Sequence, residues 1–242
     1  LSILIGIAVF FAVPNMTYEK ETKGVKEDLR LMAHAAKLPI TWYLSFFTLG
    51  YFLIRSVITY LNPYLTDAFE QSIPFAQAFS AAIRTGALMV FSPVGGMLRD
   101  KMGQSASKLI TRFSIGCIVF SVVMMYIPHG KQYAVWIMAA AVILLAFNGM
   151  MSNFLYTLVT TANVPIVYVG SVFGIASAIG YSSDLYLYTI CGSWLDSMGN
   201  AGYKYIWLVG ALGGLIMFAM GMAVKRRYGL DEVKEEKAPQ SA

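Results

Sequence analysis

Long apolar runs separated by short polar blocks organise this sequence of 242 residues. A helix needs about 20 apolar residues to cross the hydrocarbon core of a bilayer, and most of the runs have about that length. We therefore predict one partial membrane helix followed by six complete ones. The expected ranges are 1–13 for the partial helix and then 39–61, 74–98, 108–127, 132–155, 165–194 and 204–224.

The composition favours the same class of protein. Hydrophobic residues make up 57% of the chain and charged residues 13%, whereas a soluble domain has about a quarter charged residues. Only helices and closed barrels satisfy their backbone hydrogen bonds in lipid, and the sequence lacks the short alternating segments typical of barrel strands. The expected fold class is an all-α integral membrane bundle.

Basic residues gather in three blocks, within 14–38, within 99–112 and from 225 onward. Cytoplasmic loops carry an excess of Lys and Arg, so we place these blocks and the C-terminus in the cytoplasm of a multi-pass inner or plasma membrane protein. The expected organisation is a partial transmembrane helix over 1–13, a central, partly helical cytoplasmic loop over 14–38, a six-helix domain over 39–226 and a cytoplasmic tail over 227–242.

The cysteines and histidines give no sign of a metal or redox site. Cys117 and Cys191 lie inside apolar runs, where cysteine acts as a small core residue. His34 and His129 fall in predicted loops, and no nucleotide-binding loop of the G-x-x-x-x-G-K-[ST] kind occurs. We therefore expect no catalytic residue, no metal and no cofactor, and a protein that is not an enzyme.

A Gly, Asp, Gly pattern occurs twice, in GGMLRDKMG at 95–103 and in CGSWLDSMG at 191–199. Asp100 and Asp196 are 96 residues apart, and the three crossings predicted between them put the two corners on opposite sides of the membrane. Such an upside-down repeat is typical of secondary transporters, and chance recurrence of a short pattern is the alternative. Locally, Gly allows close packing, and Asp near a helix N-terminus is favoured by the helix dipole.

GGMLRDKMG resembles the loop signature of the major facilitator superfamily, G-x-x-x-D-[RK]-x-G-[RK]-[RK]. The residues that fill its first four defined positions are Gly96, Asp100, Lys101 and Gly103. Gln104 and Ser105 depart from it, because they stand where the family has basic residues. The resemblance implies a six-helix bundle of 3+3 inverted repeats, helices seven to twelve of a twelve-helix transporter. The N-terminal half would be a partner, and Asp100 would contribute to gating by contacting it.

A narrower resemblance involves IASAIGYSSDLYLYTICGSWLD and the GYKY that follows it. These stretches are similar to bacterial organic-anion and sugar-phosphate carriers. The similarity implies a small organic anion as the substrate.

Three charged residues fall inside predicted membrane helices, namely Arg55, Arg84 and Asp184. Charges at that depth are costly and usually face a polar cavity or a partner. Polar residues at helical spacing accompany them on the four helices, seven, eight, ten and eleven, that the family resemblance implies as the transport path. These stripes are Tyr51, Arg55 and Asn62; Gln77, Ser80 and Arg84; Asn148, Ser152 and Tyr156; and Ser177, Tyr181, Asp184 and Tyr188.

We hypothesise that Arg55 and Arg84 attract an anionic substrate, because guanidinium groups bind carboxylate or phosphate through two hydrogen bonds. Asp184 would pair with one arginine or carry a coupling proton. The alternative is that an arginine only pairs with Asp184 and locks helices together. All three charges are expected nearer the outer half of the membrane. The candidate substrate-binding residues are Arg55, Arg84, Asp184, Asn148, Tyr51 and Tyr181.

A further pattern concerns helix packing. Gly210 and Gly214 in GALGG form a small-xxx-small pair. The pair indicates close packing within the chain, with dimerisation as the alternative.

The predicted function is secondary active transport of a small solute by alternating access, as symport or antiport with a coupling proton or a counter-substrate. Expected partners are the solute and membrane lipid, and no nucleic acid. A membrane-embedded enzyme is the runner-up, but it would require converging His, Ser or acidic residues. A nontransporting sensor or fragment is the third interpretation, because half of a transporter cannot enclose a two-sided cavity.

Overall fold

The computed structural model describes residues 25–102 and 105–228. The chain divides into two compact units, Leu1–Arg30 and Leu31–Ala242. The helix α2 (Val25–Lys37) begins in the first unit and ends in the second. The partial helix predicted over 1–13, the first part of the central loop and the tail from 229 onward lie outside the described residues.

All regular structure in the described residues is helical, and each predicted complete span coincides with a helix or with helices joined end to end. The elements are α3 (Pro39–Val57), η1 (Ile58–Tyr60), α4 (Leu61–Asp67), α5 (Ile73–Met102), α6 (Ala106–Tyr126), η2 (Lys131–Tyr133), α7 (Ala134–Met151), α8 (Phe154–Thr161), α9 (Ile166–Tyr181), α10 (Ser183–Met198), η3 (Gly199–Ala201) and α11 (Gly202–Tyr228).

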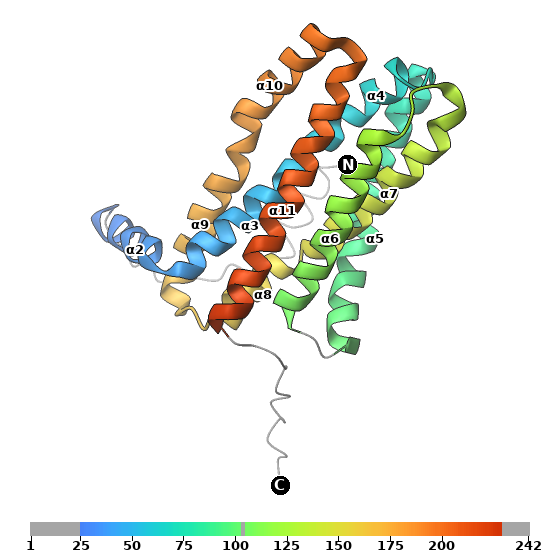
Figure 1. Cartoon of the computed structure of the whole chain (residues 1–242). Helices are drawn as coiled ribbons and strands as arrows, with labels where there is room; N and C mark the ends of the chain where they lie inside the picture. Colours follow the sequence, from blue (N-terminus) through green and yellow to red (C-terminus); the bar gives the residue numbers. More distant parts are fainter. Residues whose placement is uncertain (1–24, 103–104, 229–242) are drawn as a thin grey trace, which may run out of the picture. The chain divides into compact units, whose positions relative to one another are not determined.

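Within the described residues, five stretches are long and apolar enough to cross a membrane. The last of them, Ile166–Tyr228, has 63 residues and reverses direction between α10 and α11 (Figure 1). Gly199 ends α10 with a φ of 54°, a backbone conformation that glycine adopts without steric cost. Six passes therefore result, and the chain is an all-α, multi-pass integral membrane protein.

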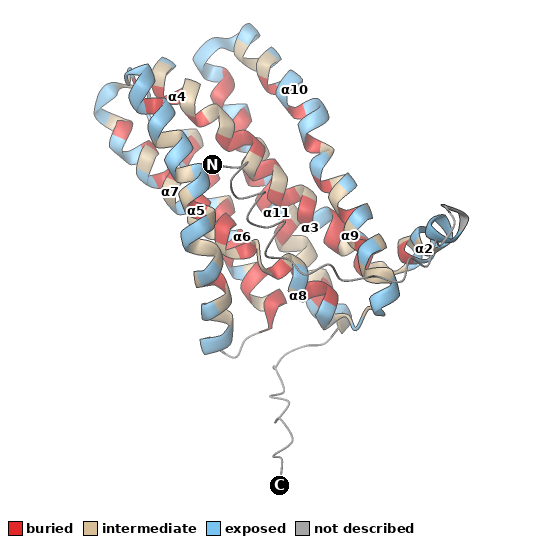
Figure 2. Cartoon of the chain, turned by 180° about the vertical axis from the view of Figure 1, so that it is seen from behind, coloured by how far each residue is buried: buried red, intermediate tan, exposed pale blue. Residues whose placement is uncertain are grey.

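The core lies where α11 packs against α6 and α3, and α3 packs in turn against α9. The helix α5 packs mainly on α7. Buried residues follow α3 and α11, while α5 and α10 show many exposed ones (Figure 2). Only 11% of the most apolar window of α5 is buried, against 67% for the span from α3 to α4, so much of the surface of α5 is not covered by this chain.

Glycines allow the central helices to approach closely. A Cβ atom placed on Gly213 of α11 would lie 2.7 Å from the carbonyl oxygen of Gly50 on α3, and one on Gly50 would lie 2.5 Å from that of Gly213. Gly210 faces Ser121, and Gly214 faces Ile118, both on α6. The small-xxx-small pair is therefore used for packing within the chain.

The two Gly, Asp, Gly corners lie at opposite ends of the helices (Figure 1), as three intervening passes require. One local explanation from the sequence is wrong, because Asp100 and Asp196 lie near the C-terminal ends of α5 and α10 and not near helix N-termini. Both side chains are exposed. The relation of the two halves as an inverted repeat stays a prediction.

In the first corner, the close approach is made by a glycine outside the family signature. A Cβ atom on Gly95 would overlap the carbonyl oxygen of Met150 on α7, whereas one on Gly96 would make an ordinary contact with Asn153. Lys101 is exposed at the end of α5, and Gly103 lies outside the described residues. Gly95 thus sets the spacing between α5 and α7.

A hydrogen-bonded contact joins the end of α4 to the start of α11. The Tyr203 hydroxyl donates to the Asp67 carboxylate at 3.0 Å, and the Asn200 side chain donates to the Asp67 carbonyl at 3.1 Å. A hydrogen bond to a charged group contributes roughly 1.5 kcal/mol, and 1 kcal/mol corresponds to about 2–4 °C for a chain of this size. We expect Tyr203→Phe to lower the thermal unfolding midpoint in detergent by about 3–6 °C.

The matched control is Tyr205→Phe, two residues further along α11, where the side chain is partly exposed and its ring contact with Trp194 is kept by phenylalanine. We expect this control to unfold at the midpoint of the unmodified protein. Equal midpoints for the two variants would mean that the Asp67 contact does not stabilise the bundle.

Candidate functional site

A cavity of about 400 Å³ opens between α3, α5 and the consecutive helices α9 and α10. A few hundred Å³ is the usual size of a small-molecule site. The lining residues are Tyr51, Phe52, Arg55, Ser56, Arg84, Leu88, Tyr181, Asp184 and Tyr188. The fold thus brings together five of the six residues that the sequence put forward as substrate-binding candidates, and their role in binding stays a prediction.

The helix α3 supplies one wall of the cavity. Tyr51 and Arg55 are four residues apart, so their side chains leave the same face of α3 about one turn apart. The Cζ atom of Arg55 lies 6.0 Å from the centre of the Tyr51 ring, a distance at which a cation is attracted to an aromatic face. The ring therefore helps to hold the guanidinium of Arg55 along this wall.

Arg84 enters the cavity from α5. Its Nη1 atom donates a hydrogen bond to Thr59 Oγ1 at 3.4 Å. Thr59 lies in η1, the short 3₁₀ segment that interrupts the span from α3 to α4. Because 3₁₀ segments inside long helices often mark hinges, Arg84 contacts a candidate hinge of this span.

Asp184 lies in the first turn of α10, where the helix dipole favours a negative charge. Its Oδ1 atom accepts a hydrogen bond from the Ser56 hydroxyl of α3 at 2.6 Å. The helix pair α9–α10 is interrupted at Ser182, just before this turn. The carboxylate is therefore held against α3 by a hydroxyl group.

The alternative left open by the sequence is an ion pair between one arginine and Asp184 that locks helices together. The described part of the structure does not show such a pair. Among the described residues, neither Arg55 nor Arg84 forms an ion pair with Asp184; Arg55 contacts Tyr51 and Arg84 contacts Thr59. A guanidinium has five N–H donors, and these contacts use few of them. The cavity therefore presents two cations and one anion whose charges are not cancelled by direct pairing.

Aromatic side chains make further contacts at and beside the cavity. The rings of Phe52 and Tyr181 lie 4.1 Å apart. The Tyr60 hydroxyl donates to the Tyr188 carbonyl at 3.1 Å, which ties η1 to α10. These contacts join α9 and α10 to the span from α3 to α4 beside the charged groups.

Asn148, the sixth candidate, does not line the cavity. It is 1% exposed, and its Nδ2 atom lies 3.5 Å from the Tyr51 carbonyl oxygen, a weak hydrogen bond behind the wall. Tyr156 of the same predicted stripe is 67% exposed. The stripe fails because α7 ends at Met151 and α8 begins at Phe154, so residues on either side of the break do not share a face.

The residues between α7 and α8 form a second polar cluster with α5. The Ser152 hydroxyl donates to Ser92 Oγ at 2.8 Å, and Asn153 Nδ2 donates to the Ser92 carbonyl at 2.7 Å. Arg99 Nη1 donates to Thr157 Oγ1 at 3.3 Å. These bonds join α5 to the break between α7 and α8, so the polar residues of this region serve helix packing.

Sequence reasoning missed Ser56 and Thr59, the two hydroxyl groups that contact the charged side chains. Ser56 falls off the stripe drawn from Tyr51 through Arg55, whereas Thr59 continues its four-residue spacing and was left out of it. Each bonds to a residue distant in the sequence. The available signal was a small polar residue within four positions of an intramembrane arginine.

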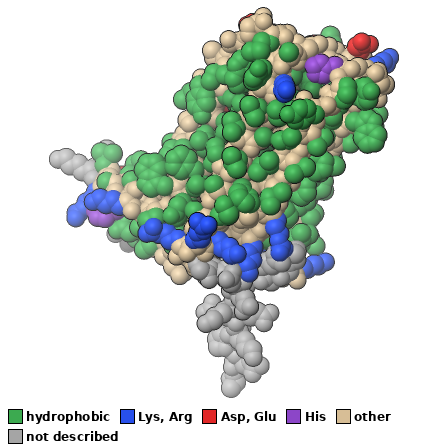
Figure 3. Space-filling view, viewed as in Figure 1, with side chains coloured by type: hydrophobic (Ala, Val, Ile, Leu, Met, Phe, Trp, Pro, Cys, Tyr) green, Lys and Arg blue, Asp and Glu red, His purple; other side chains and the backbone are tan. Residues whose placement is uncertain are grey.

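The cavity lies about midway along the helices, and Arg84 and Asp184 are exposed on its open side. Basic side chains gather at one end of the face formed by α6 and α11 (Figure 3), the end at which α3 begins. Arg55 comes 16 residues after Pro39, and Asp67 closes the span 12 residues later. Arg84 comes 11 residues after the start of α5 and 18 before its end. Both arginines are thus somewhat closer to the end opposite the basic one.

Metal-ligating residues do not cluster within the described residues, where no group of three or more His, Cys, Asp or Glu is close enough to hold an ion. Cys117 and Cys191 are both buried and free. The polar groups that the cavity offers are therefore hydroxyl, guanidinium and carboxyl side chains.

Comparison with known proteins places the chain among membrane proteins. It is 29% identical over 234 residues to "Inner membrane protein YqcE" of Escherichia coli (strain K12), a match that covers 93% of this chain and 55% of the relative. It is 23% identical over 211 residues to "Inner membrane protein YihN" of the same organism, covering 84% of this chain and 50% of the relative.

A third relative is named for a transport activity. The chain is 28% identical over 169 residues to "Probable nitrate/nitrite transporter NarK2" of Mycobacterium tuberculosis, covering 69% of this chain and 40% of the relative. The chain spans about half the length of the Escherichia coli relatives that it matches. No protein-family model and no solved structure matches the chain.

Proposed function

We propose that this chain is part of a secondary transporter that moves a small anion across the inner membrane by alternating access. The observation that carries the proposal is the cavity in which Arg55, Arg84 and Asp184, from three different membrane helices, meet without an arginine–carboxylate ion pair. Intramembrane charges in such a position usually mark a substrate path. The family we propose is the major facilitator superfamily, which the signature at 95–103 and the transporter relative support.

The charge of the cavity supports an anion as the substrate class. Two guanidinium groups exceed the single carboxylate, and guanidinium forks bind oxyanions through paired hydrogen bonds. Nitrate and nitrite, named for the mycobacterial relative, are oxyanions as well. For this chain we propose a small organic anion, because a cavity of about 400 Å³ leaves room for more than an inorganic ion.

We propose that the coupling step acts through Asp184. Its carboxylate accepts from Ser56 at 2.6 Å and lies beside both arginines in the cavity lining. Protonation or the arrival of a counter-substrate would change the charge that the arginines meet. The transporter would then work as a symporter with a proton or as an antiporter with a second anion.

We propose that an N-terminal half of the transporter covers the open side of the cavity. Exposed apolar side chains on α5 and α10 support this, for example Met89 at 74% and Leu185 at 84% exposure. The twofold greater length of the Escherichia coli relatives supports it too. In this arrangement Asp100, exposed at the end of α5, contacts the other half and contributes to gating. The basic end and the C-terminus face the cytoplasm.

The test is a thermal-shift screen of the full-length protein in detergent against small carboxylates, sugar phosphates, nitrate, neutral sugars and amines. A ligand that binds only the folded state raises the unfolding midpoint by mass action. We expect at least one anion, and no neutral or cationic compound, to stabilise the protein, and the same anion to exchange across proteoliposomes that contain it. Stabilisation by sugars or amines alone would overturn the anion assignment.

A further inference from the structure

A second cavity, of about 570 Å³, lies between the start of α6 and the end of α11. Its lining residues are Lys108, Thr111, Arg112, Met222, Lys225 and Arg226. Four of these six residues are basic and none is acidic. This basic pocket is separate from the anion cavity, with which it shares no lining residue.

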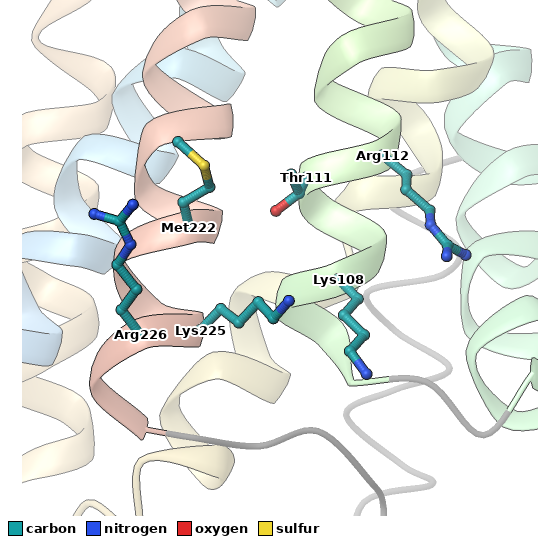
Figure 4. Close-up of a pocket in the computed structure, with 6 residues that line it drawn as sticks. All are labelled: Lys108, Thr111, Arg112, Met222, Lys225 and Arg226. Carbon is teal, nitrogen blue, oxygen red and sulfur yellow. The ribbon is translucent and has the colours of Figure 1, made fainter.

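The side chains of the basic pocket come from the facing ends of α6 and α11 (Figure 4). Lys225 of α11 and Thr111 of α6 reach into the gap, whereas Arg226 lies on the side of α11 away from α6 and Arg112 on the side of α6 away from α11 (Figure 4). A phosphate group suits this end of the helices, because Lys225 can donate to it in the gap and the flanking basic residues supply further positive charge.

An apolar stripe on α6 continues the pocket toward the middle of the membrane. Lys108 and Arg112 are followed on the same helix face by Ile115, Val119 and Val122, which are 37–48% exposed. Ile115 lies about 10 Å along the helix from Lys108, and Val122 about 21 Å. One leaflet of the hydrocarbon core is about 15 Å deep, so the stripe covers the depth of an acyl chain.

The helix α11 carries a matching stripe. Leu208, Leu212 and Leu215 are 40–53% exposed and precede Met222 on the face that leads to Arg226. No charged residue interrupts either helix between 113 and 127 or between 205 and 224. Lys and Arg side chains accordingly lie along the edge of a broad hydrophobic surface (Figure 3).

We propose that this basic pocket binds the phosphate headgroup of an anionic phospholipid, whose acyl chains lie along the apolar stripes of α6 and α11. Basic pockets between membrane helices, at the level of the headgroups, are suited to acidic lipids. Charge selects the headgroup, and the continuous apolar surface beside the pocket selects a lipid over a soluble phosphate. The lipid holds the ends of α6 and α11 together, and its binding is independent of the transported solute.

The test is native mass spectrometry of the delipidated full-length protein, titrated with phosphatidylglycerol or with phosphatidylcholine of identical acyl chains. The variants change α11, because Lys108 and Arg112 take part in further interactions within the chain. We expect Lys225→Gln to weaken phosphatidylglycerol binding about fivefold and Lys225→Gln/Arg226→Gln about 25-fold. Binding of phosphatidylcholine is expected to be weak and unchanged.

The matched control is Arg227→Gln, which removes one charge from an adjacent, exposed position of α11 that does not line the pocket. We expect it to leave phosphatidylglycerol binding unchanged. Equal losses for Lys225→Gln and Arg227→Gln would overturn the proposal in favour of a diffuse surface charge.

Two further results would also overturn it. Displacement of the lipid by glycerol phosphate at equal concentration would make the pocket a site for soluble phosphates. A dimer that persists when phosphatidylglycerol is added, and that is lost in Leu212→Ser, would assign the apolar stripes to a second copy of the chain.

Discussion

Replacing Arg84 with glutamine is expected to weaken binding of the stabilising anion by about 10- to 100-fold. Glutamine keeps a polar side chain of similar length but removes the positive charge and the planar fork of donors. A hydrogen bond to a charged group contributes about 1.5–3 kcal/mol, and each 1.4 kcal/mol is about tenfold in affinity. Arg55→Gln should have a comparable effect, since both guanidinium groups line the same cavity.

The measurement is the anion concentration that gives half of the maximal thermal shift, followed by uptake into proteoliposomes. Lys131→Gln is the matched control, because it removes one positive charge from an exposed position in η2, outside the cavity. We expect the control to bind the anion as the unmodified protein does. Unaltered binding and uptake in Arg84→Gln, for every anion that stabilises the protein, would remove Arg84 from the site.

Arg84→Lys separates charge from geometry. Lysine keeps the charge but presents it as a compact ammonium group that cannot bind an oxyanion through two parallel hydrogen bonds. We expect affinity between those of the arginine and glutamine forms. Full affinity with lysine would mean that Arg84 acts on the anion through its charge alone.

The charged residues of the cavity could be found from the sequence because burying a charged side chain in lipid costs free energy. An arginine or aspartate in a long apolar run must face other protein groups or water. The sequence therefore predicts that Arg55, Arg84 and Asp184 face a common polar cavity. The structure brings them into one cavity. The six complete spans could be predicted because the thickness of the bilayer sets their length.

Other features depend on contacts that the sequence does not encode locally. Asn148 was grouped with Tyr156 by helical spacing, but the helix breaks between them at Ser152 and Asn153. The Ser56–Asp184 hydrogen bond joins residues 128 positions apart. In the first corner, the family signature pointed to Gly96, whereas Gly95 is the residue that meets a backbone carbonyl. Helical spacing alone can specify neither the break between α7 and α8 nor these contacts between distant residues.

Gly213→Ala is expected to lower the thermal unfolding midpoint by about 2–10 °C. The added Cβ would lie 2.7 Å from the Gly50 carbonyl oxygen and 3.1 Å from the Leu53 side chain, so α11 would have to move away from α3. Forcing an extra carbon into a packed core costs about 1–3 kcal/mol, and for a chain of this size each kcal/mol is about 2–4 °C. The penalty outweighs the helix propensity of alanine, which alone would favour the variant by about 0.5–1 kcal/mol.

Gly174→Ala on α9 is the matched control, because a Cβ atom placed there meets no atom within 4 Å in this chain. With no contact to disturb, the propensity gain remains, and we expect the midpoint of this variant to stay the same or rise slightly.

Gly50→Ala makes the reciprocal contact at 2.5 Å, so it should destabilise at least as much as Gly213→Ala. Once either alanine has separated the helices, the second costs less, and the double variant should unfold above the midpoint expected from adding the two losses. Equal midpoints for Gly213→Ala and Gly174→Ala would mean that the approach of α3 and α11 at Gly50 and Gly213 does not limit the stability of the bundle.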